Sequence, residues 1–390
     1  MNPSKFIVLC LYISIFWRDI LAFFGVSTTI TLIMLIAFTF LGLIRVARNS
    51  AYGNPVNINH FIILVFSVLL WALSIGKSIL DSGQLNLSNY YLAIPVAFII
   101  VSLDARFFFK IVALHLLISI LISFYEIISR SYLYDYVAAD GTILDSNLFG
   151  GGIGVFRAKG LFQGPLSQVA IAYWVCFIYR QKISAFILFL AAILSSGRLG
   201  LLVGSSFFLW RIIQPKSLPK SNQNPSNFSK NFFLILFVSV ALYLSFLSMT
   251  DTKIMFISTL FDLSNSQTSS RFEFWSMSIN EFLKYDFASI IFGNYGYIQD
   301  FQGGTENDFL RIALDNGLIL LILYAIIFSL LIFASIKKKD LELFIIVMSV
   351  FLLMNLFPFI QSLSSTLMFW TLFLSILSKN KESSVNQSKY

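Results

Sequence analysis

Apolar segments long enough to cross a lipid bilayer recur along the whole chain, and this pattern constrains the fold more than any other feature. A membrane-spanning helix needs about 20 mostly apolar residues, and inside lipid only helices and closed barrels satisfy their own backbone polar groups. Of the 390 residues, 57% are hydrophobic and 12% are charged, whereas a soluble protein has about 25% charged residues. The sequence therefore predicts an all-α, polytopic helical membrane protein.

Hydropathy predicts twelve membrane spans, which form a single transmembrane domain over residues 1–377. They lie near 6–24, 28–44, 60–79, 89–103, 107–128, 165–179, 183–196, 199–213, 231–249, 317–335, 341–356 and 359–377. The longer connections are two loops at 129–164 and 250–316 and a linker rich in Pro, Ser and Asn at 214–230. The polar tail at 378–390 is expected to be disordered.

The distribution of basic residues predicts the orientation of these spans, because Lys and Arg accumulate in cytoplasmic loops. If the N-terminus is cytoplasmic, seventeen of the 27 Lys and Arg residues but only four of the 19 Asp and Glu residues face the cytoplasm. Both termini are then cytoplasmic and both long loops are periplasmic. The net charge of +8 thus follows from topology and from attraction to the lipid bilayer. It does not indicate a nucleic-acid partner, which would need a concentrated basic surface.

Few residues are available for metal binding or for disulfides. Cys10 and Cys176 both lie inside apolar runs, and the chain has only two histidines. We expect two buried free thiols, no disulfide framework, no metal site and no cofactor.

Three arginines on the outer side oppose the orientation rule and are candidate phosphate ligands: Arg157, Arg198 and Arg271. A guanidinium can bind phosphate through two parallel hydrogen bonds. Arg157 and Lys159 adjoin a glycine-rich stretch whose exposed amides could assist. Small residues around Arg198 would let a phosphate approach the backbone. The alternatives are a solvated cation for Arg157, a snorkelling or capping residue for Arg198, and an ion pair with Glu273 for Arg271.

Arg271 also begins an amphipathic segment that is expected to lie on the outer membrane surface. Trp275, four residues further on, is either a membrane anchor or a platform for a sugar ring. Both interpretations stay open at this point.

Glu306, Asn307 and Asp308 stand at the start of a predicted span, close to the end of the second long loop. Acidic residues at a helix start stabilise it, and Asp308 is the better candidate for a pure cap. Glu306 lies further out and is the first candidate for a general base, with Asp308 second and Asn307 as a possible sugar-binding residue. Asp315 and Asn316 are expected to form a turn.

Two further charged pairs are expected to be structural. Arg18 and Asp19 interrupt the first span and predict an internal ion pair. Glu126 and Arg130 are spaced i,i+4 at a helix exit and predict a surface pair.

Taken in order, four motifs resemble the O-antigen polymerase and ligase superfamily of bacterial surface-polysaccharide enzymes. They are RAKGLFQGP at 157–165, the Ser-Gly-Arg turn ending at Arg198, Arg-x-x-x-Trp at 271–275 and ENDFLRIALDNG at 306–317. The resemblance implies a GT-C-like membrane glycosyltransferase architecture, with a large periplasmic loop over a cavity. There, arginines hold the diphosphate of an undecaprenyl-diphosphate-linked oligosaccharide.

By this resemblance, Arg198 and Arg271 correspond to the two phosphate-binding arginines, and Arg157 to a further basic position. The ligases carry His-Asn where this chain has Glu306-Asn307, which favours the polymerase branch. The expected protein is a metal-independent repeat-unit polymerase of the bacterial inner membrane, with a chain-length regulator as a further partner. An O-antigen ligase and a flippase for the same lipid are the alternatives.

Overall fold

The computed structural model describes the parts of the chain that form most of the predicted helices. These are residues 2–51, 89–134, 136–137, 143–144, 158–162, 164–179, 182–194, 275–294, 307–337 and 362–387, together with separate helical residues between 64 and 79 and between 344 and 355. Arg157, Arg198, Arg271 and Glu306 lie outside them, as do the predicted spans at 199–213 and 231–249 and the linker at 214–230.

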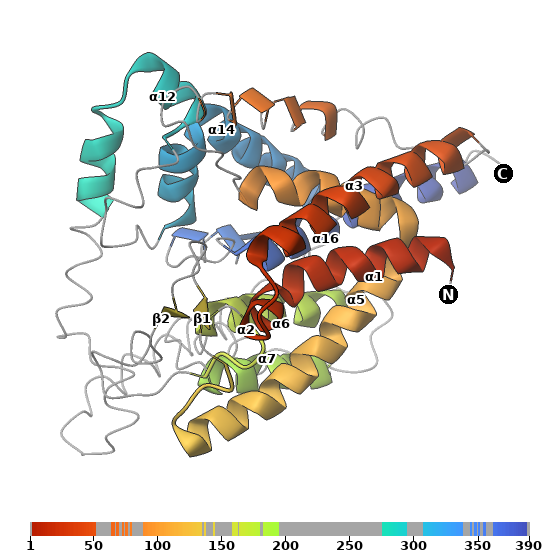
Figure 1. Ribbon diagram of the computed structural model, residues 1–390. Coiled ribbons are helices and arrows are strands. Elements are labelled where there is room, and N and C mark those ends of the chain that lie inside the picture. The colour runs from red at the N-terminus through yellow and green to blue at the C-terminus, as the bar shows by residue number, and fades with distance from the viewer. Residues whose placement is uncertain are drawn as a thin grey trace.

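The described residues are mostly helical, as predicted (Figure 1). The helices are α1 (Pro3–Phe16), α2 (Arg18–Phe23), α3 (Thr28–Ala51), α5 (Asn89–Ser129), α6 (Pro165–Tyr179), α7 (Lys182–Leu194), α12 (Phe287–Phe292), α14 (Asp308–Lys337) and α16 (Leu363–Gln387). Within the described residues, the only departure from an all-α fold is a small antiparallel hairpin in the first long loop. Its strands are β1 (Tyr136–Val137) and β2 (Ile143–Leu144).

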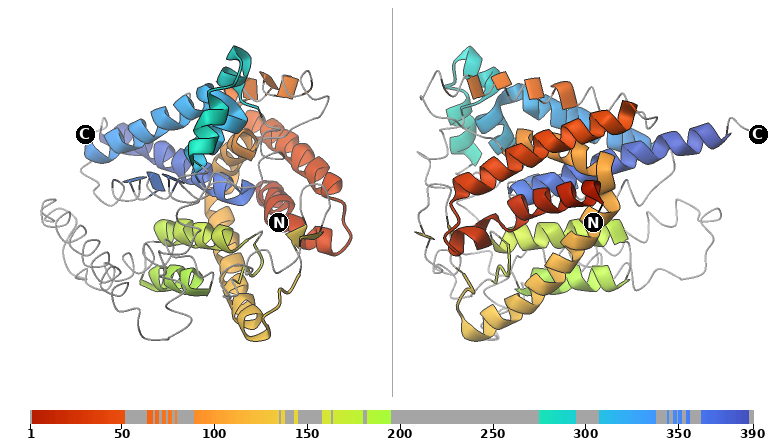
Figure 2. Two further views of the ribbon diagram at one scale, coloured as in Figure 1. Left: turned by 90° about the vertical axis from the view of Figure 1, so that its left-hand side faces the viewer. Right: turned by 45° about the vertical axis from the view of Figure 1, so that its right-hand side comes forward.

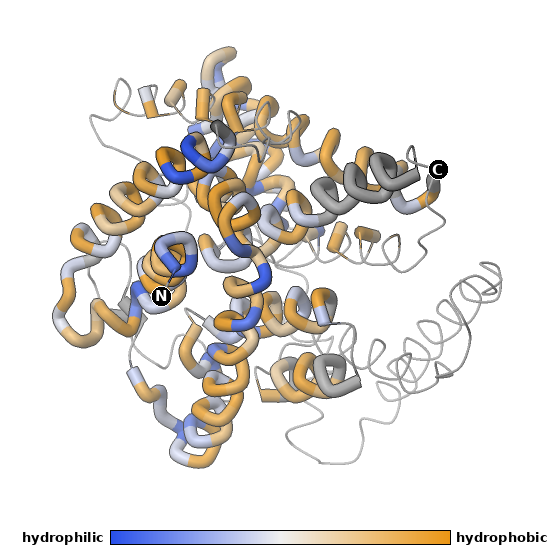
Figure 3. Tube along the Cα trace, turned by 90° about the vertical axis from the view of Figure 1, so that its right-hand side faces the viewer, coloured by the Kyte–Doolittle hydropathy of each residue, from blue (hydrophilic) through white to orange (hydrophobic). Residues whose placement is uncertain are grey.

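Three of the described helices are long and apolar enough to cross a membrane. The apolar stretches are Thr29–Ser50, Tyr91–Ser129 and Asp308–Phe333, and α1, α6 and α16 contain shorter ones. In Figure 3, most of the described helices are orange, the colour of hydrophobic residues. Large apolar side chains such as Ile33 and Phe40 are more than half exposed on α3, as a lipid-facing surface requires. These features suit a helical membrane protein.

Helix α5 lies at the centre of the packing and contacts α1, α3, α6, α7 and α16. The start of α1 and the end of α16 lie at one end of the molecule, on the right in Figure 1, while α2, the hairpin and α12 lie at the opposite end (Figures 1 and 2). The start of α1 and the end of α16 thus lie together, away from the described parts of the two long loops.

The predicted boundary between the spans 89–103 and 107–128 is confirmed as a break inside α5. Asp104 has extended backbone angles (φ −163°, ψ 78°) within an otherwise helical stretch. Its carboxylate accepts a hydrogen bond from the backbone N–H of Phe107 at 2.9 Å. Asp104 thus acts as an N-cap for the second half of the helix, which is why the chain can change direction there.

A second break divides α14 at Gly317. The expected turn at Asp315 and Asn316 was wrong in its position, because both residues are still helical and the break follows them. Gly317 has a φ of 77°, which favours glycine. A Cβ atom at this position would run into the carbonyl of Ile291 in α12. The backbone N–H of Asn294 also donates to the carbonyl of Leu314 at 2.7 Å. Glycine is therefore needed because the end of α12 packs directly against this break.

Two expectations at the chain ends were wrong. The first predicted span, 6–24, is divided: α1 ends at Phe16 and the short helix α2 begins at Arg18. Helix α16 continues to Gln387 instead of giving way to disorder at Ser378. The tail contains Lys, Glu and Gln, which extend a helix at little cost once a buried segment has nucleated it.

Candidate functional site

Asn307 and Asp308 lie at the first turn of α14, but the capping residue is Asn307 and not Asp308 as expected. The Asn307 Oδ1 atom accepts the backbone N–H of Leu310 at 3.0 Å, and its Nδ2 atom donates to the carbonyl of Asn355 at 3.2 Å. A cap must precede the accepted N–H by two or three residues, and Asn307 has that position. Asp308 is 0% exposed, so a substrate hydroxyl does not reach it in this conformation.

Trp275 is the first described residue of a helical stretch that runs to residue 282 and is followed by α12. Met277 and Ile279 in this stretch are about half exposed, and Leu283 and Phe287, which follow it, are 74% and 79% exposed. Ser278 in the same stretch is buried. Exposed apolar side chains are compatible with a segment that lies against lipid, but Ser276 and Asn280 are exposed as well, and Trp275 is half-buried, so both interpretations of Trp275 stay predictions.

The best-defined polar site in the described residues joins the end of α5 to the segment 158–162 before α6. Glu126, fully buried, accepts three backbone N–H groups. Its Oε2 atom bonds to Lys159 and Gly160 at 2.9 and 2.8 Å, and its Oε1 atom bonds to Leu133 at 3.3 Å. Backbone donors therefore compensate a buried carboxylate that would otherwise be costly.

The expected surface pair of Glu126 with Arg130 was wrong. Helix α5 ends at Ser129, and Arg130 is exposed with a left-handed backbone (φ 52°). The i,i+4 spacing brings side chains together only while the helix continues. Glu126 instead turns inward.

Lys159 fills the space beside this carboxylate. Its side chain is fully buried, and its ammonium group lies 3.7 Å from the centre of the Tyr134 ring and 5.3 Å from that of Tyr132. Burial, with the negative charges of Asp19 and Glu126, holds the pKa of the Tyr134 phenol well above its ordinary value. The ring is thus a neutral cation–π partner for Lys159, and Lys159 is a structural cation and not an exposed phosphate ligand.

Every backbone N–H from Ala158 to Phe162 has an acceptor. Lys159 and Gly160 donate to Glu126, Leu161 to the Ser119 hydroxyl at 2.9 Å, Phe162 to the Lys159 carbonyl and Ala158 to the Leu194 carbonyl, both at 3.1 Å. The expectation that amides of the glycine-rich stretch are exposed to a phosphate was therefore wrong for this part of it. Glu126 takes the position that an external anion would need.

The polar residues of α5 that build this site are His115, Ser119, Ser123 and Glu126, which recur every three or four residues. That spacing places them on one face of a helix. Ser119 and Ser123 both donate to the Gln168 Oε1 atom of α6, at 3.2 and 2.9 Å. Sequence reasoning missed this stripe, although polar residues at helical spacing in an apolar span signal a buried polar contact.

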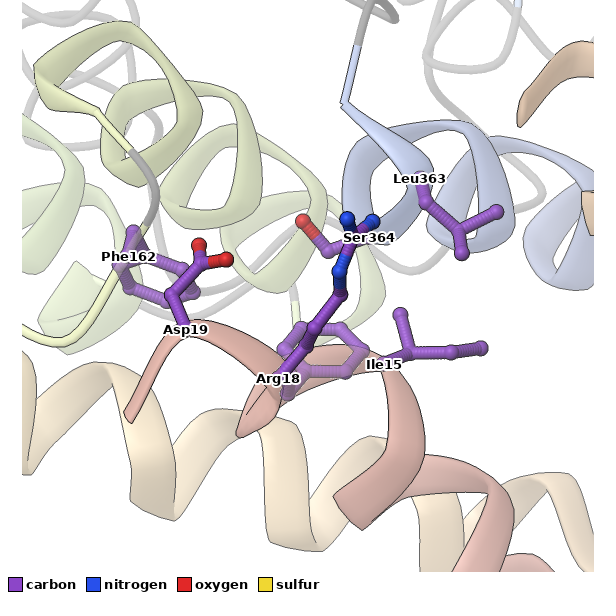
Figure 4. Close-up of a pocket in the computed structure, with 7 residues that line it drawn as sticks. Ile15, Arg18, Asp19, Phe162, Leu363 and Ser364 are labelled. Atoms are coloured by element: carbon purple, nitrogen blue, oxygen red, sulfur yellow. The ribbon is translucent and has the colours of Figure 1, made fainter. Parts of the chain in front are cut away.

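A partly open recess lies next to this site, where the end of α1, the segment 158–162 and the start of α16 meet (Figure 4). Its polar lining residues are Arg18, Asp19 and Ser364. The Arg18 side chain extends toward Ser364, whereas the Asp19 carboxyl points toward Phe162. The expected ion pair of Arg18 with Asp19 was wrong, because consecutive residues on a helix do not face each other.

Burial raises the pKa of the Asp19 carboxyl, and the positive charges of Arg18 and Lys159 oppose this rise. Asp19 lies in α2, beyond the end of α1. The Asp19 carboxyl thus feels the positive charges of Arg18 and Lys159, although it forms no direct ion pair with either.

The hydrogen bond from Ala158 to Leu194 connects two of the motifs that the sequence singled out. Arg157 directly precedes Ala158, and Arg198 follows Leu194 by four residues. Four residues of chain span at most about 14 Å. The bond therefore limits how far apart the backbones of the two arginines can lie.

In comparisons with known proteins, no family model matches this chain, and no curated protein matches it.

Proposed function

We propose that the protein is a repeat-unit polymerase for O-antigen or a related surface polysaccharide. It would transfer the growing glycan from undecaprenyl diphosphate to the non-reducing sugar of a lipid-linked repeat unit. The reaction would take place at the periplasmic face of the bacterial inner membrane, on a twelve-span, GT-C-like scaffold with cytoplasmic termini. The described apolar helices support the membrane location, and the motifs at 157–165, 195–198, 271–275 and 306–317 support the chemistry.

The observation that carries the proposal is the hydrogen bond between Ala158 and Leu194 at 3.1 Å. It ties the chain beside Arg157 to the chain that leads to Arg198, and Glu126 fixes the first of these through Lys159 and Gly160. Because Arg157 and Arg198 both lie close in sequence to this bond, we propose that they hold one diphosphate, whose developing charge such donors would stabilise.

The proposed reaction needs no metal. The bond between the anomeric carbon and the diphosphate oxygen breaks, and the electron pair leaves with the diphosphate. Arg198, Arg271 and Arg157 stabilise that charge. The acceptor hydroxyl forms the new glycosidic bond and transfers its proton to Glu306. Glu306 is preferred over Asp308 because Asp308 is enclosed at the start of α14.

The test uses the purified full-length protein and a defined undecaprenyl-diphosphate-linked repeat unit. Arg198→Ala and Arg271→Ala are each expected to lower the polymerisation rate about 100-fold, as the loss of one charge-stabilising donor does in other enzymes. Lys284→Ala is the matched control, because Lys284 is exposed and pairs only with Glu281 among the described residues. Wild-type rates in both arginine variants would show that the site is wrong.

Two further assays separate the alternative functions. A ligase would transfer the glycan to lipid A core when that acceptor is supplied. A flippase would move the labelled lipid across a vesicle membrane without forming a glycosidic bond. Either outcome, without elongation of the repeat unit, contradicts the polymerase proposal.

A further inference from the structure

We propose that the recess around Arg18 binds a phosphate group. The proposal does not depend on the proposed function. It rests on the direction of the Arg18 side chain, on the hydrogen-bonding partners around it and on its depth relative to the exposed aromatic residues of α2.

The Arg18 guanidinium is directed into the recess. Its side chain extends from α2 toward Ser364 at the start of α16 (Figure 4). Among the residues that the structure describes, none accepts a hydrogen bond from Arg18 or forms an ion pair with it. A guanidinium carries five N–H donors in a fixed planar arrangement. A ligand with several acceptor oxygens and a negative charge is the natural complement.

The neighbouring charges leave the recess open to an anion. Glu126 is bound by three backbone N–H groups and does not line the recess. Asp19 lines it, but its carboxyl is turned toward Phe162 and lies within the electrostatic influence of Lys159. Arg18 is therefore the charged group whose polar end faces the start of α16, where the Ser364 hydroxyl can add a further hydrogen bond.

Exposed aromatic residues around Arg18 indicate that the recess lies at the depth of lipid headgroups. Trp17 is 39% exposed, Phe23 50% and Phe24 74%. The Trp17 Nε1 atom donates to the Tyr12 hydroxyl at 3.1 Å, and its ring packs edge-on against His115, so Trp17 is held at this position while part of it stays exposed. Aromatic residues of this kind gather at the boundary between hydrocarbon and headgroups. A phosphate that reaches Arg18 at this depth is either part of a lipid headgroup or free in solution.

The binding test uses the full-length protein in a mild detergent. Dioctanoyl phosphatidic acid is titrated and bound lipid is counted by native mass spectrometry, with dioctanoylglycerol as the probe that lacks the phosphate. Inorganic phosphate is titrated in parallel by calorimetry. If phosphatidic acid and inorganic phosphate both bind, and the loss of Arg18 weakens both, the recess is a site for free phosphate. If only phosphatidic acid binds, the recess is a site for a lipid headgroup.

Three variants make the test specific. Arg18→Gln is expected to weaken phosphatidic acid binding by about tenfold or more, and Arg18→Lys by less, because an ammonium keeps the charge but not the planar donors. Arg130→Gln is the matched control: Arg130 is an exposed arginine that follows the end of α5 and does not line the recess. It is expected to change the affinity by less than about twofold, as a distant exposed charge does.

Asp19→Asn provides an independent variant should Arg18→Gln fail to fold. It removes a negative charge from the lining of the recess and is expected to tighten binding of the phosphate probe. The proposal is overturned if dioctanoylglycerol binds as tightly as phosphatidic acid. It is also overturned if neither Arg18→Lys nor Asp19→Asn changes the affinity, or if Arg130→Gln lowers it as much as Arg18→Gln.

Discussion

The carboxylate of Glu126 accepts the backbone N–H of Gly160 at 2.8 Å, across 34 residues of sequence. Through this bond and the adjacent one to Lys159, the end of α5 fixes the chain that follows Arg157. A buried side chain in an apolar helix thus determines the backbone beside a motif on which the proposed chemistry depends.

Glu126→Gln is expected to destabilise the protein by about 3 kcal/mol, as the loss of a buried charged partner does. The amide NH₂ group cannot accept a hydrogen bond, so at least one of the backbone N–H groups that now bond to Glu126 would lose its acceptor. The positive charge of Lys159 would also lose a negative neighbour. The apparent melting temperature in detergent measures the effect. Glu281→Gln is the control, because the pair of Glu281 with Lys284 is solvent-exposed and should contribute about 0.5 kcal/mol. Equal melting temperatures for the two variants would contradict this role of Glu126.

Gly160→Ala is expected to be much more harmful than Gly25→Ala. Both glycines have positive φ, 57° and 84°, and either substitution costs about 1–2 kcal/mol for the left-handed backbone. A Cβ on Gly160 would also collide with the Ser119 side chain and backbone, whereas a Cβ on Gly25 would meet no atom within 4 Å. The difference in melting temperature between the two variants therefore isolates the steric contribution. If Gly25→Ala melts lower, the packing described around Gly160 is wrong.

Asn307→Ala is expected to lower stability by about 1 kcal/mol or more, because α14 loses its N-cap. Asn307→Ser keeps a capping oxygen and loses the bond to the Asn355 carbonyl, so it should be less harmful. Thermal melting of both variants checks the order. If Asn307 only caps, the rate of polymerisation per folded molecule should be unchanged in Asn307→Ser. A large loss of rate with normal stability would instead support direct sugar binding.

Cysteine labelling tests the predicted orientation. The two native cysteines, Cys10 and Cys176, are buried, so they should react slowly with a membrane-impermeant maleimide. Lys284→Cys, in the second long loop, should be labelled in cells whose outer membrane has been permeabilised. Lys110→Cys, exposed just after the break in α5, should be labelled only after the inner membrane is opened. The reverse pattern would invert the topology and place the proposed site on the wrong side.

Features that depend on local sequence were predicted well. The break near Asp104 and the helix over 165–179 follow from hydropathy, a capping aspartate and flanking loop residues, all of which act over a few positions. An interruption near Gly317 was predicted for the same reason, but it lies at Gly317 itself and not at Asp315 and Asn316, and its packing against Ile291 was not predicted.

Features that depend on contacts between distant segments were not predictable from spacing. Glu126 and Arg130 have the spacing of a surface pair, but the helix ends between them and Glu126 binds Lys159 and Gly160 instead. The predicted role of Lys159 was wrong for the same reason. Its charge suggested that it binds phosphate, but its side chain is buried beside the Tyr134 ring and does not reach the protein surface. Of the predicted site residues, Arg157, Arg198, Arg271 and Glu306 lie outside the described residues, so their roles stay predictions.

Elongation of a defined undecaprenyl-diphosphate-linked repeat unit by the purified full-length protein tests the central proposal most directly. The products are separated by size on a gel, without any other enzyme present. The proposal predicts a ladder in which each step adds one repeat unit. Only unextended starting material, under conditions in which the protein remains folded, would contradict it.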